Sequence, residues 1–272
     1  MPRSSERVLK NYNRHFRLSA TLLFPGRFGG NSRKYDYFCD SKNNKMIRGV
    51  LFDMDGVLVN NTQAHVKAFE IFCERYGVED WQHKLQTAFG MGNDDIMRLI
   101  LPEEIIREKG MKALGEEKEA IYREVYAPEI RPVRGLVAEG AALAVAIIEE
   151  LRRRGIRCAV GSSGCRENVD FVLSNCGITD YFSCIVSGDR VTRCKPDPEI
   201  YLLAAEGLHL PSAECLVFED ARVGITAARR AGAGRIVALA TTLPRHTLAT
   251  QTEADVVIDD FASITDLNTL LL

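Results

Sequence analysis

The sequence lacks any stretch of 18 residues without an Asp, Glu, Lys or Arg, which excludes an ordinary membrane-spanning helix. Its eight cysteines include no Cys-X-X-Cys pair and no spacing typical of a zinc site. We therefore expect reduced thiols and a cytoplasmic protein. With 21 Gly and 9 Pro in 272 residues, and 46% of residues hydrophobic, the composition also excludes collagen-like and disordered chains.

The charges are distributed unevenly along the chain, although the formal net charge is only −2. Residues 1–45 carry ten basic and three acidic residues, a net +7, whereas residues 46–272 carry 25 basic and 34 acidic residues, a net −9. Residues 1–45 show no apolar period of a helix or strand, so we expect an unstructured basic extension. Two alternatives stay open for it, an organelle transit peptide and a basic arm for an acidic partner. The acidic body disfavours nucleic acid as a partner.

From Met46 onward, short apolar segments alternate with helical ones. The alternation predicts an α/β fold with a Rossmann-like parallel sheet. Between the first two strands the pattern is helical only, which predicts an inserted α-helical cap domain over residues 61–131, with the core formed by 46–60 and 132–272. Strands are expected at 47–52, 158–160, 184–186, 215–218, 235–239 and 256–258, and helices at 62–77, 93–100, 103–110, 112–126, 136–153, 165–176, 198–207, 222–232 and the C-terminus.

Polar residues follow four of the predicted strands. Ligand sites of open α/β sheets lie at the carboxyl ends of the strands, so these residues are expected to meet there. An isolated Asp-X-Asp or Glu-Asp pair is usually solvated surface, but four such segments in order point to one site. The segments are Asp53-Met54-Asp55-Gly56, Gly161-Ser162-Ser163-Gly164, Lys195-Pro196-Asp197 and Glu219-Asp220.

These side chains predict a phosphoryl-transfer site. Clustered carboxylates are costly when unpaired, and a hard cation such as Mg²⁺ offsets their charge and suits a phosphate substrate. A lysine, a serine hydroxyl and backbone N–H groups near a helix start can hold the phosphate oxygens. An Asp carboxylate can then act as nucleophile, and a second carboxyl two residues later can transfer the proton.

The segments VLFDMDGVLVNN, VGSSG, CKPDPEIY and VFEDARVGITAARRAG resemble the four motifs of the haloacid dehalogenase-like superfamily. The resemblance is closest to its β-phosphoglucomutase/phosphoglycolate phosphatase-like branch, in which a helical cap follows the first motif. It covers residues 46–272 and none of residues 1–45.

The resemblance implies a role for each matching residue. Asp53 is expected to be the nucleophile and a ligand of Mg²⁺, and Asp55 the general acid/base with its carbonyl on the metal. Ser162 and Ser163 would hold the phosphoryl group, and Lys195 would neutralise Asp53 and the phosphate. Mg²⁺ would also be anchored by Glu219 and Asp220. Because relatives that cleave carbon–halogen or phosphonate bonds lack the second Asp, Asp55 favours a phosphatase or phosphomutase.

The cap entry distinguishes these two activities. The β-phosphoglucomutase pattern has an Asp, a Thr and a His here, whereas this chain has Asn60, Asn61 and His65. We expect Asn61 and His65 to contact the substrate. The next cap loop, 89–93, has none of the basic residues with which a mutase holds a second phosphate, and Arg98 could replace them only in part.

The sequence therefore predicts a Mg²⁺-dependent phosphatase that hydrolyses a small phosphorylated metabolite. A β-phosphoglucomutase-type phosphomutase and a non-catalytic module that binds phosphometabolites or a protein remain as alternatives. We expect no nucleic acid or membrane partner, and a monomer or weak dimer.

Overall fold

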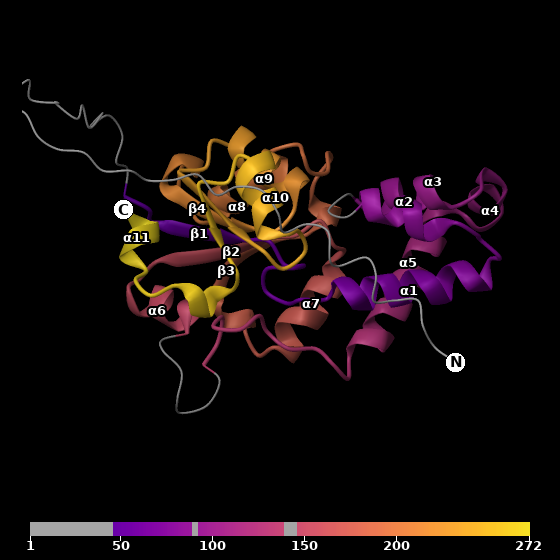
Figure 1. Ribbon diagram of the computed structural model, residues 1–272, viewed down its shortest axis with the longest axis horizontal. Coiled ribbons are helices and arrows are strands. Elements are labelled where there is room, and N and C mark those ends of the chain that lie inside the picture. Colours follow the sequence, from indigo (N-terminus) through magenta and orange to yellow (C-terminus); the bar gives the residue numbers. More distant parts are fainter. Residues whose placement is uncertain (1–45, 89–91, 139–145) are drawn as a thin grey trace, which may run out of the picture. The chain divides into compact units, whose positions relative to one another are not determined.

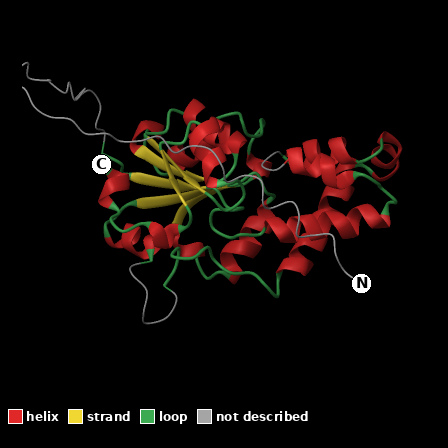
Figure 2. Ribbon diagram, in the orientation of Figure 1, coloured by secondary structure: helices red, strands yellow, loops and turns green. Residues whose placement is uncertain are grey.

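A sheet of six parallel strands forms the centre of the computed structural model, which describes residues 46–88, 92–138 and 146–272 (Figure 2). The expectations for residues 1–45 and for loop residues 89–91 lie outside the described residues. The strands lie in the order β3-β2-β1-β4-β5-β6, so the predicted Rossmann-like α/β core is confirmed. Their bounds are β1 (Gly49–Phe52), β2 (Arg157–Gly161), β3 (Phe182–Val186), β4 (Cys215–Glu219), β5 (Arg235–Leu239) and β6 (Val256–Ile258).

Strand β1 lies in the middle of the sheet and determines where a ligand can bind. Its Phe52 is in register with Val160 of β2 on one side and with Phe218 of β4 on the other. The chain thus extends the sheet first to one side of β1 and later to the other. Such a reversal of strand order opens a crevice at the carboxyl ends of the central strands.

Helices cover both faces of the sheet, which explains why β1 and β4 are buried along their whole length (Figure 1). Val50 and Phe52 of β1 face one apolar core, and Leu51 faces the other. The first face is covered by α6 (Ile147–Arg153), α7 (Arg166–Asn175) and α11 (Asn268–Leu271), and the second by α8 (Glu199–Gly207), α9 (Arg222–Arg230) and α10 (Arg245–Gln251). Short 3₁₀ helices span Thr179–Tyr181, Gly188–Arg190, Ser212–Glu214 and Phe261–Ser263.

A helical cap is inserted between β1 and β2, as predicted. Helices α1 and α5 pack side by side and share buried aromatic residues, including Phe69 and Tyr122 (Figure 1). The cap follows the carboxyl end of β1, so it lies next to the crevice of the sheet. Its helices are α1 (Thr62–Arg75), α2 (Trp81–Ala88), α3 (Asn93–Ile100), α4 (Glu103–Lys109) and α5 (Met111–Tyr126).

Three helix predictions need correction. Helices α2 and α10 were not predicted, and the long helix expected over 136–153 is helical among the described residues only at Ile147–Arg153. Residues 134–137 form turns and bends instead. Gly135 has φ +82°, and a Cβ there would lie 2.3 Å from the backbone nitrogen of Ala262. The chain therefore turns at this close approach before the helix begins.

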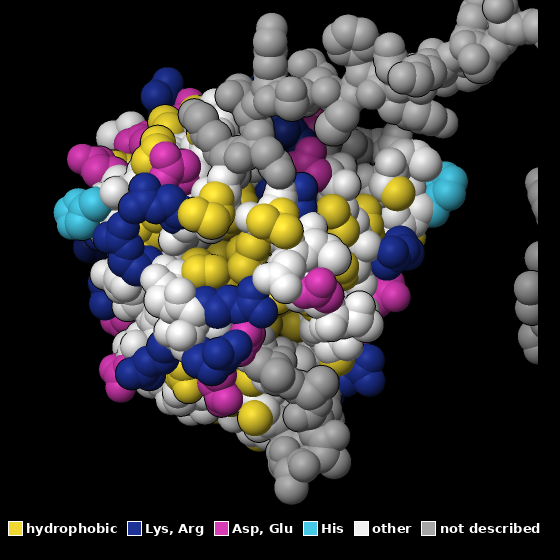
Figure 3. All heavy atoms as spheres, turned by 90° about the vertical axis from the view of Figure 1, so that its left-hand side faces the viewer, with side chains coloured by type: hydrophobic (Ala, Val, Ile, Leu, Met, Phe, Trp, Pro, Cys, Tyr) yellow, Lys and Arg dark blue, Asp and Glu magenta, His cyan; other side chains and the backbone are white. Residues whose placement is uncertain are grey.

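The opposite end of the sheet, where the strands begin, has a different surface. Lys and Arg side chains surround a group of apolar side chains on this face (Figure 3). Arg157 and Arg235 begin β2 and β5, and the exposed Met46 precedes β1. No helix of the described residues is long and apolar enough to cross a membrane. The cysteines that the structure describes are all free thiols.

Candidate active site

A cavity lies at the carboxyl ends of β1 and β4, between the sheet and the helical cap. The loop after β1 contributes Asp53 and Asp55, and the end of β4 contributes Glu219 and Asp220. Lys195 reaches the same place from the loop between β3 and α8. Parallel strands end at one edge of the sheet, so residues up to 167 positions apart in the sequence meet there.

Asp53, Lys195 and Glu219 form a buried ion-pair network. The Lys195 Nζ donates to Asp53 Oδ1 at 2.6 Å and to Glu219 Oε1 at 2.7 Å. The Tyr201 hydroxyl lies 3.0 Å from the same Nζ and donates to Glu219 Oε1 at 2.7 Å. Burial and the neighbouring carboxylates raise the pKa of Tyr201 well above its usual value, so its hydroxyl stays a hydrogen-bond donor. Tyr201 lies in the segment CKPDPEIY, but no feature of the local sequence indicated a role for it.

Glu219 is held by hydrogen bonds on both carboxylate oxygens. Its Oε2 accepts from the backbone N–H groups of Asp220 and Ala221 at 2.9 and 3.0 Å, while Oε1 faces Lys195 and Tyr201. Gly224 of α9 leaves the room for this carboxylate, because a Cβ there would lie 1.6 Å from Oε1. Glu219 therefore positions Lys195 and the start of the next loop.

Three carboxylates of this site can share one cation. Oxygen atoms of Asp53, Glu219 and Asp220 lie within 4.8 Å of one another, and all three residues are buried. Burial, opposed by Lys195, raises the pKa of Asp53 to about 7, and burial with Glu219 and Asp53 raises that of Asp220. One lysine does not balance three buried carboxylates, so the donor set fits a divalent cation with oxygen ligands such as Mg²⁺.

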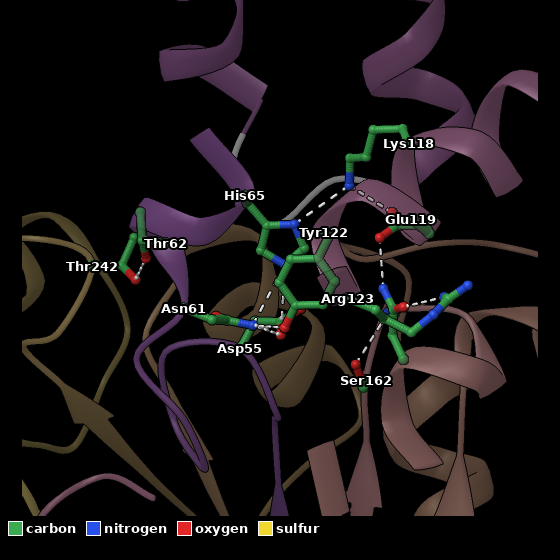
Figure 4. A network of polar contacts seen from close by, with 12 residues as sticks. Asp55, Asn61, Thr62, His65, Lys118, Glu119, Tyr122, Arg123, Ser162 and Thr242 are labelled. Carbon is green, nitrogen blue, oxygen red and sulfur yellow. Dashed lines mark hydrogen bonds and ion pairs between the residues drawn. The ribbon is translucent and has the colours of Figure 1, made fainter. Parts of the chain in front are cut away.

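Asp55 lies at the border between the sheet and the cap (Figure 4). Asn61 Nδ2 donates to Asp55 Oδ1 at 2.5 Å, and His65 Nε2 lies 3.9 Å from the same oxygen. Burial acts to raise the pKa of Asp55, but the contacts with His65 and Asn61 hold it below its ordinary value. Asn61 is the N-cap residue of α1, but its side chain makes no capping hydrogen bond. The side chain is therefore free to donate to Asp55.

A family model described as haloacid dehalogenase-like hydrolase matches residues 47–232. This chain belongs to that family. CbbY from Rhodobacter capsulatus is 32% identical over 195 residues, which cover 68% of this chain and 82% of CbbY. The chloroplastic protein SUPPRESSOR OF QUENCHING 1 from Arabidopsis thaliana is 34% identical over 72% of this chain, which spans only 18% of that longer protein.

Solved structures agree with the family assignment. CbbY from Rhodobacter sphaeroides, in complex with phosphate, has a TM-score of 0.66 at 26% identity, covering 84% of this chain and all of that one. A β-phosphoglucomutase from Clostridium difficile shares the fold with a TM-score of 0.68. The chain is therefore an enzyme of the phosphoglucomutase/phosphatase-like branch of the haloacid dehalogenase-like hydrolases.

The serine motif of this hydrolase forms a turn beside the cavity. Ser162 is completely buried, its hydroxyl accepts a hydrogen bond from the Gly164 N–H at 3.1 Å, and it does not line the cavity. Ser163 and Gly164 line the cavity instead. The Ser162 hydroxyl therefore stabilises the turn that presents Ser163 and Gly164 to the cavity.

The cap of this hydrolase also contributes residues that sequence reasoning missed. Lys118 and Glu119 of α5 line the cavity, and the Lys118 Nζ lies 3.4 Å from His65 Nδ1. The His65 ring stacks on Tyr122 with centroids 3.9 Å apart (Figure 4). The sequence singled out Arg98 as the basic residue of the cap, whereas the structure places Lys118 at the cavity. A signal was present, because Lys118 shares a helix face with the buried Leu114 and Tyr122.

Proposed function

We propose that this hydrolase is a Mg²⁺-dependent phosphatase that acts on a small phosphorylated metabolite, a sugar phosphate or similar, through an aspartyl-phosphate on Asp53. The observation that carries the proposal is the pair of carboxylates at the cavity. Asp53 is buried against Lys195, and Asp55, two residues later, has its side chain 36% exposed. A nucleophile and a proton-transfer group thus lie side by side at the end of β1.

The reaction has two steps. A carboxylate oxygen of Asp53 attacks the phosphorus, the bond to the leaving alcohol breaks, and the alcohol oxygen takes the proton of Asp55. Water then attacks the aspartyl-phosphate, Asp55 takes the proton of that water, and phosphate leaves with Asp53 regenerated. The negative charge of an incoming phosphate raises the pKa of Asp55, which favours the protonated carboxyl that the first step requires.

The surrounding residues prepare these steps. Lys195 orients Asp53 by holding its Oδ1, and the turn of Ser162, Ser163 and Gly164 presents polar groups to the phosphoryl oxygens. Asp53 and Asp220 would hold Mg²⁺, with Glu219 nearby. When bound, Mg²⁺ supplies positive charge that offsets the charge of the phosphoryl oxygens.

The relatives support the substrate class. A Thermotoga maritima relative, 29% identical, is named a phosphorylated carbohydrates phosphatase, and an Escherichia coli relative, 27% identical, a fructose-1-phosphate phosphatase. CbbY from Rhodobacter sphaeroides is known in complex with xylulose-(1,5)bisphosphate. These names favour a phosphorylated carbohydrate over a protein or nucleic acid substrate.

Phosphate release from a panel of sugar phosphates, phosphoglycolate and nucleotides tests the proposal. We expect activity with Mg²⁺ that EDTA abolishes. Asp53→Asn is expected to lower kcat by on the order of 10³-fold or more. The exposed Asp180→Asn, on a 3₁₀ helix away from the cavity, is the matched control and keeps its activity. Full activity in Asp53→Asn would refute the assigned nucleophile.

The phosphomutase alternative gains one observation, the cap residue Lys118 in the cavity. A second phosphate needs a free cation, however, and Lys118 is paired with Glu119. Incubation of β-glucose 1-phosphate with a catalytic amount of bisphosphate distinguishes the two. We expect free phosphate and no glucose 6-phosphate.

We propose the cytoplasm as the compartment. The chloroplastic name of the Arabidopsis relative supports organelle targeting by residues 1–45 as the alternative.

A further inference from the structure

The cap side of the cavity holds a neighbouring pair of opposite charges, Lys118 and Glu119 (Figure 4). Their side chains are 3% and 9% exposed, and Lys118 Nζ lies 2.6 Å from Glu119 Oε1. The same Nζ lies 4.6 Å from the centre of the Phe69 ring. A lysine this deeply buried would otherwise be a strong anchor for an anion, because little water competes for its charge.

A hydrogen bond from the sheet domain holds Glu119 in its ion pair with Lys118. Its Oε2 accepts from Asn168 Nδ2 of α7 at 2.6 Å, and Asn168 Oδ1 accepts from Arg123 at 2.7 Å. Burial acts to raise the pKa of Glu119, but Lys118 holds it below the ordinary value, so Glu119 is ionised at neutral pH. The charge of Lys118 is therefore neutralised where the cap meets α7.

No unpaired cation faces the substrate from the described residues that line the cavity. Lys118 and Lys195 are the only Lys or Arg side chains among them, and Lys195 is committed to Asp53 and Glu219. His65 also lines the cavity from the cap, and its Nε2 lies 3.9 Å from Asp55 Oδ1. The rest of the cap-side lining is apolar or uncharged and includes Phe69, Leu85, Asn93 and Ile96. Apolar surface and amide groups suit the C–H faces and hydroxyls of a polyol.

We propose that the leaving group of the substrate is neutral and hydroxylated, and that Glu119 is a specificity residue that disfavours leaving groups with a carboxylate or second phosphate. The inference rests on the proposed phosphatase function and narrows its substrate class. Glu119 acts by pairing with Lys118, which would otherwise bind the second anionic group. Discrimination arises because an anion would have to break this pair or lie beside an unpaired carboxylate.

Two matched substrate pairs test the inference. Glycerol 3-phosphate and 3-phosphoglycerate differ by a hydroxymethyl against a carboxylate, and fructose 1-phosphate and fructose 1,6-bisphosphate differ by one phosphate. For the unmodified chain with Mg²⁺, we expect kcat/KM to be at least about tenfold higher for the neutral member. A preference for the anionic member of either pair would overturn the inference.

A charge variant tests the role of Glu119 directly. Glu119→Gln keeps the size of the side chain and frees Lys118, so the kcat/KM ratio should shift at least about tenfold toward the anionic member. Adding Lys118→Gln removes the freed cation and should reverse the shift. Glu116→Gln, exposed on the same helix, is the control and leaves the ratio unchanged.

The ratio separates specificity from folding, because a smaller folded fraction lowers both rates equally. A ratio in Glu119→Gln equal to that in Glu116→Gln would overturn the role of Glu119. Phosphate release from none of the substrates by the unmodified chain would instead refute the phosphatase proposal itself, and the inference with it.

Discussion

Removal of the divalent cation should make the stability of this hydrolase depend on pH in an unusual direction. Burial raises the pKa of Asp53 from 3.8 to about 7 in the metal-free fold. Between these two values the folded chain binds more protons than the unfolded chain. Its free energy of unfolding therefore falls as the pH rises from 3.8 to 7. The paired acids Asp55 and Glu119, whose pKa values are lowered, act in the opposite direction, but they titrate below about pH 4.5.

The shift of Asp53 sets the size of the effect. About three pKa units correspond to about 4 kcal/mol, of which about 3 kcal/mol is lost between pH 5 and pH 8. For a folded region of this size, such a loss in the free energy of unfolding lowers the Tm by roughly 5–10 °C. Bound Mg²⁺ favours the ionised carboxylate, so the gain in stability on adding Mg²⁺ should grow by a similar amount over the same range.

Urea or thermal unfolding at pH 5, 6, 7 and 8, in EDTA and in Mg²⁺, measures both quantities. Asp53→Asn removes one of the two carboxyls whose pKa burial raises, the other being Asp220, and should make the EDTA profile less steep. The exposed Asp180→Asn should keep the profile of the unmodified chain. An EDTA profile that is flat between pH 5 and pH 8, or equally steep in Mg²⁺, would refute the argument from the buried carboxylates.

Three further predictions address the residues around this site and the basic extension. Tyr201→Phe removes a hydrogen bond to Glu219 that helps to position Lys195, and should lower kcat about tenfold with little change in KM, measured by steady-state kinetics. Gly224→Ala places a methyl group against the fixed Glu219 carboxylate and should cost about 1–3 kcal/mol of stability in urea unfolding. A chain that begins at Met46 should match the full chain in solubility and phosphatase activity; a large loss of either would contradict a dispensable extension.

Local sequence pattern predicted most of the sheet domain because its elements are strongly apolar. The bounds of β5 and β6 agree with the expectation residue for residue. The missed helices have weak patterns: α2 is only eight residues long, and Leu248 is the only buried residue of α10. Such short helices are stabilised by tertiary contacts rather than by their own periodicity.

The core of the candidate site was predictable because its residues directly follow apolar strands. Asp53, Asp55, Glu219 and Asp220 meet at the cavity for that reason. The polar pair on the cap was not predictable in this way. Lys118 stands in the segment GEEKEAIYRE, whose charges suggest a solvated helix face, and its burial depends on Phe69 of α1 and on the sheet domain beyond it. Residues buried by packing between distant elements leave only a weak local signal.

The two sides of the cavity differ in charge, and this difference separates binding of the phosphoryl group from recognition of the leaving group. On the sheet side, Asp53, Glu219 and Asp220 exceed the charge of Lys195, so that side requires a cation and attracts a phosphate through it. On the cap side, Lys118 and Glu119 cancel each other. A cation on the sheet side therefore serves any phosphate monoester, whereas a change of one charge on α5 alters which ester is accepted. Substitutions at Lys118 and Glu119 should accordingly change substrate preference without disturbing the chemistry at Asp53.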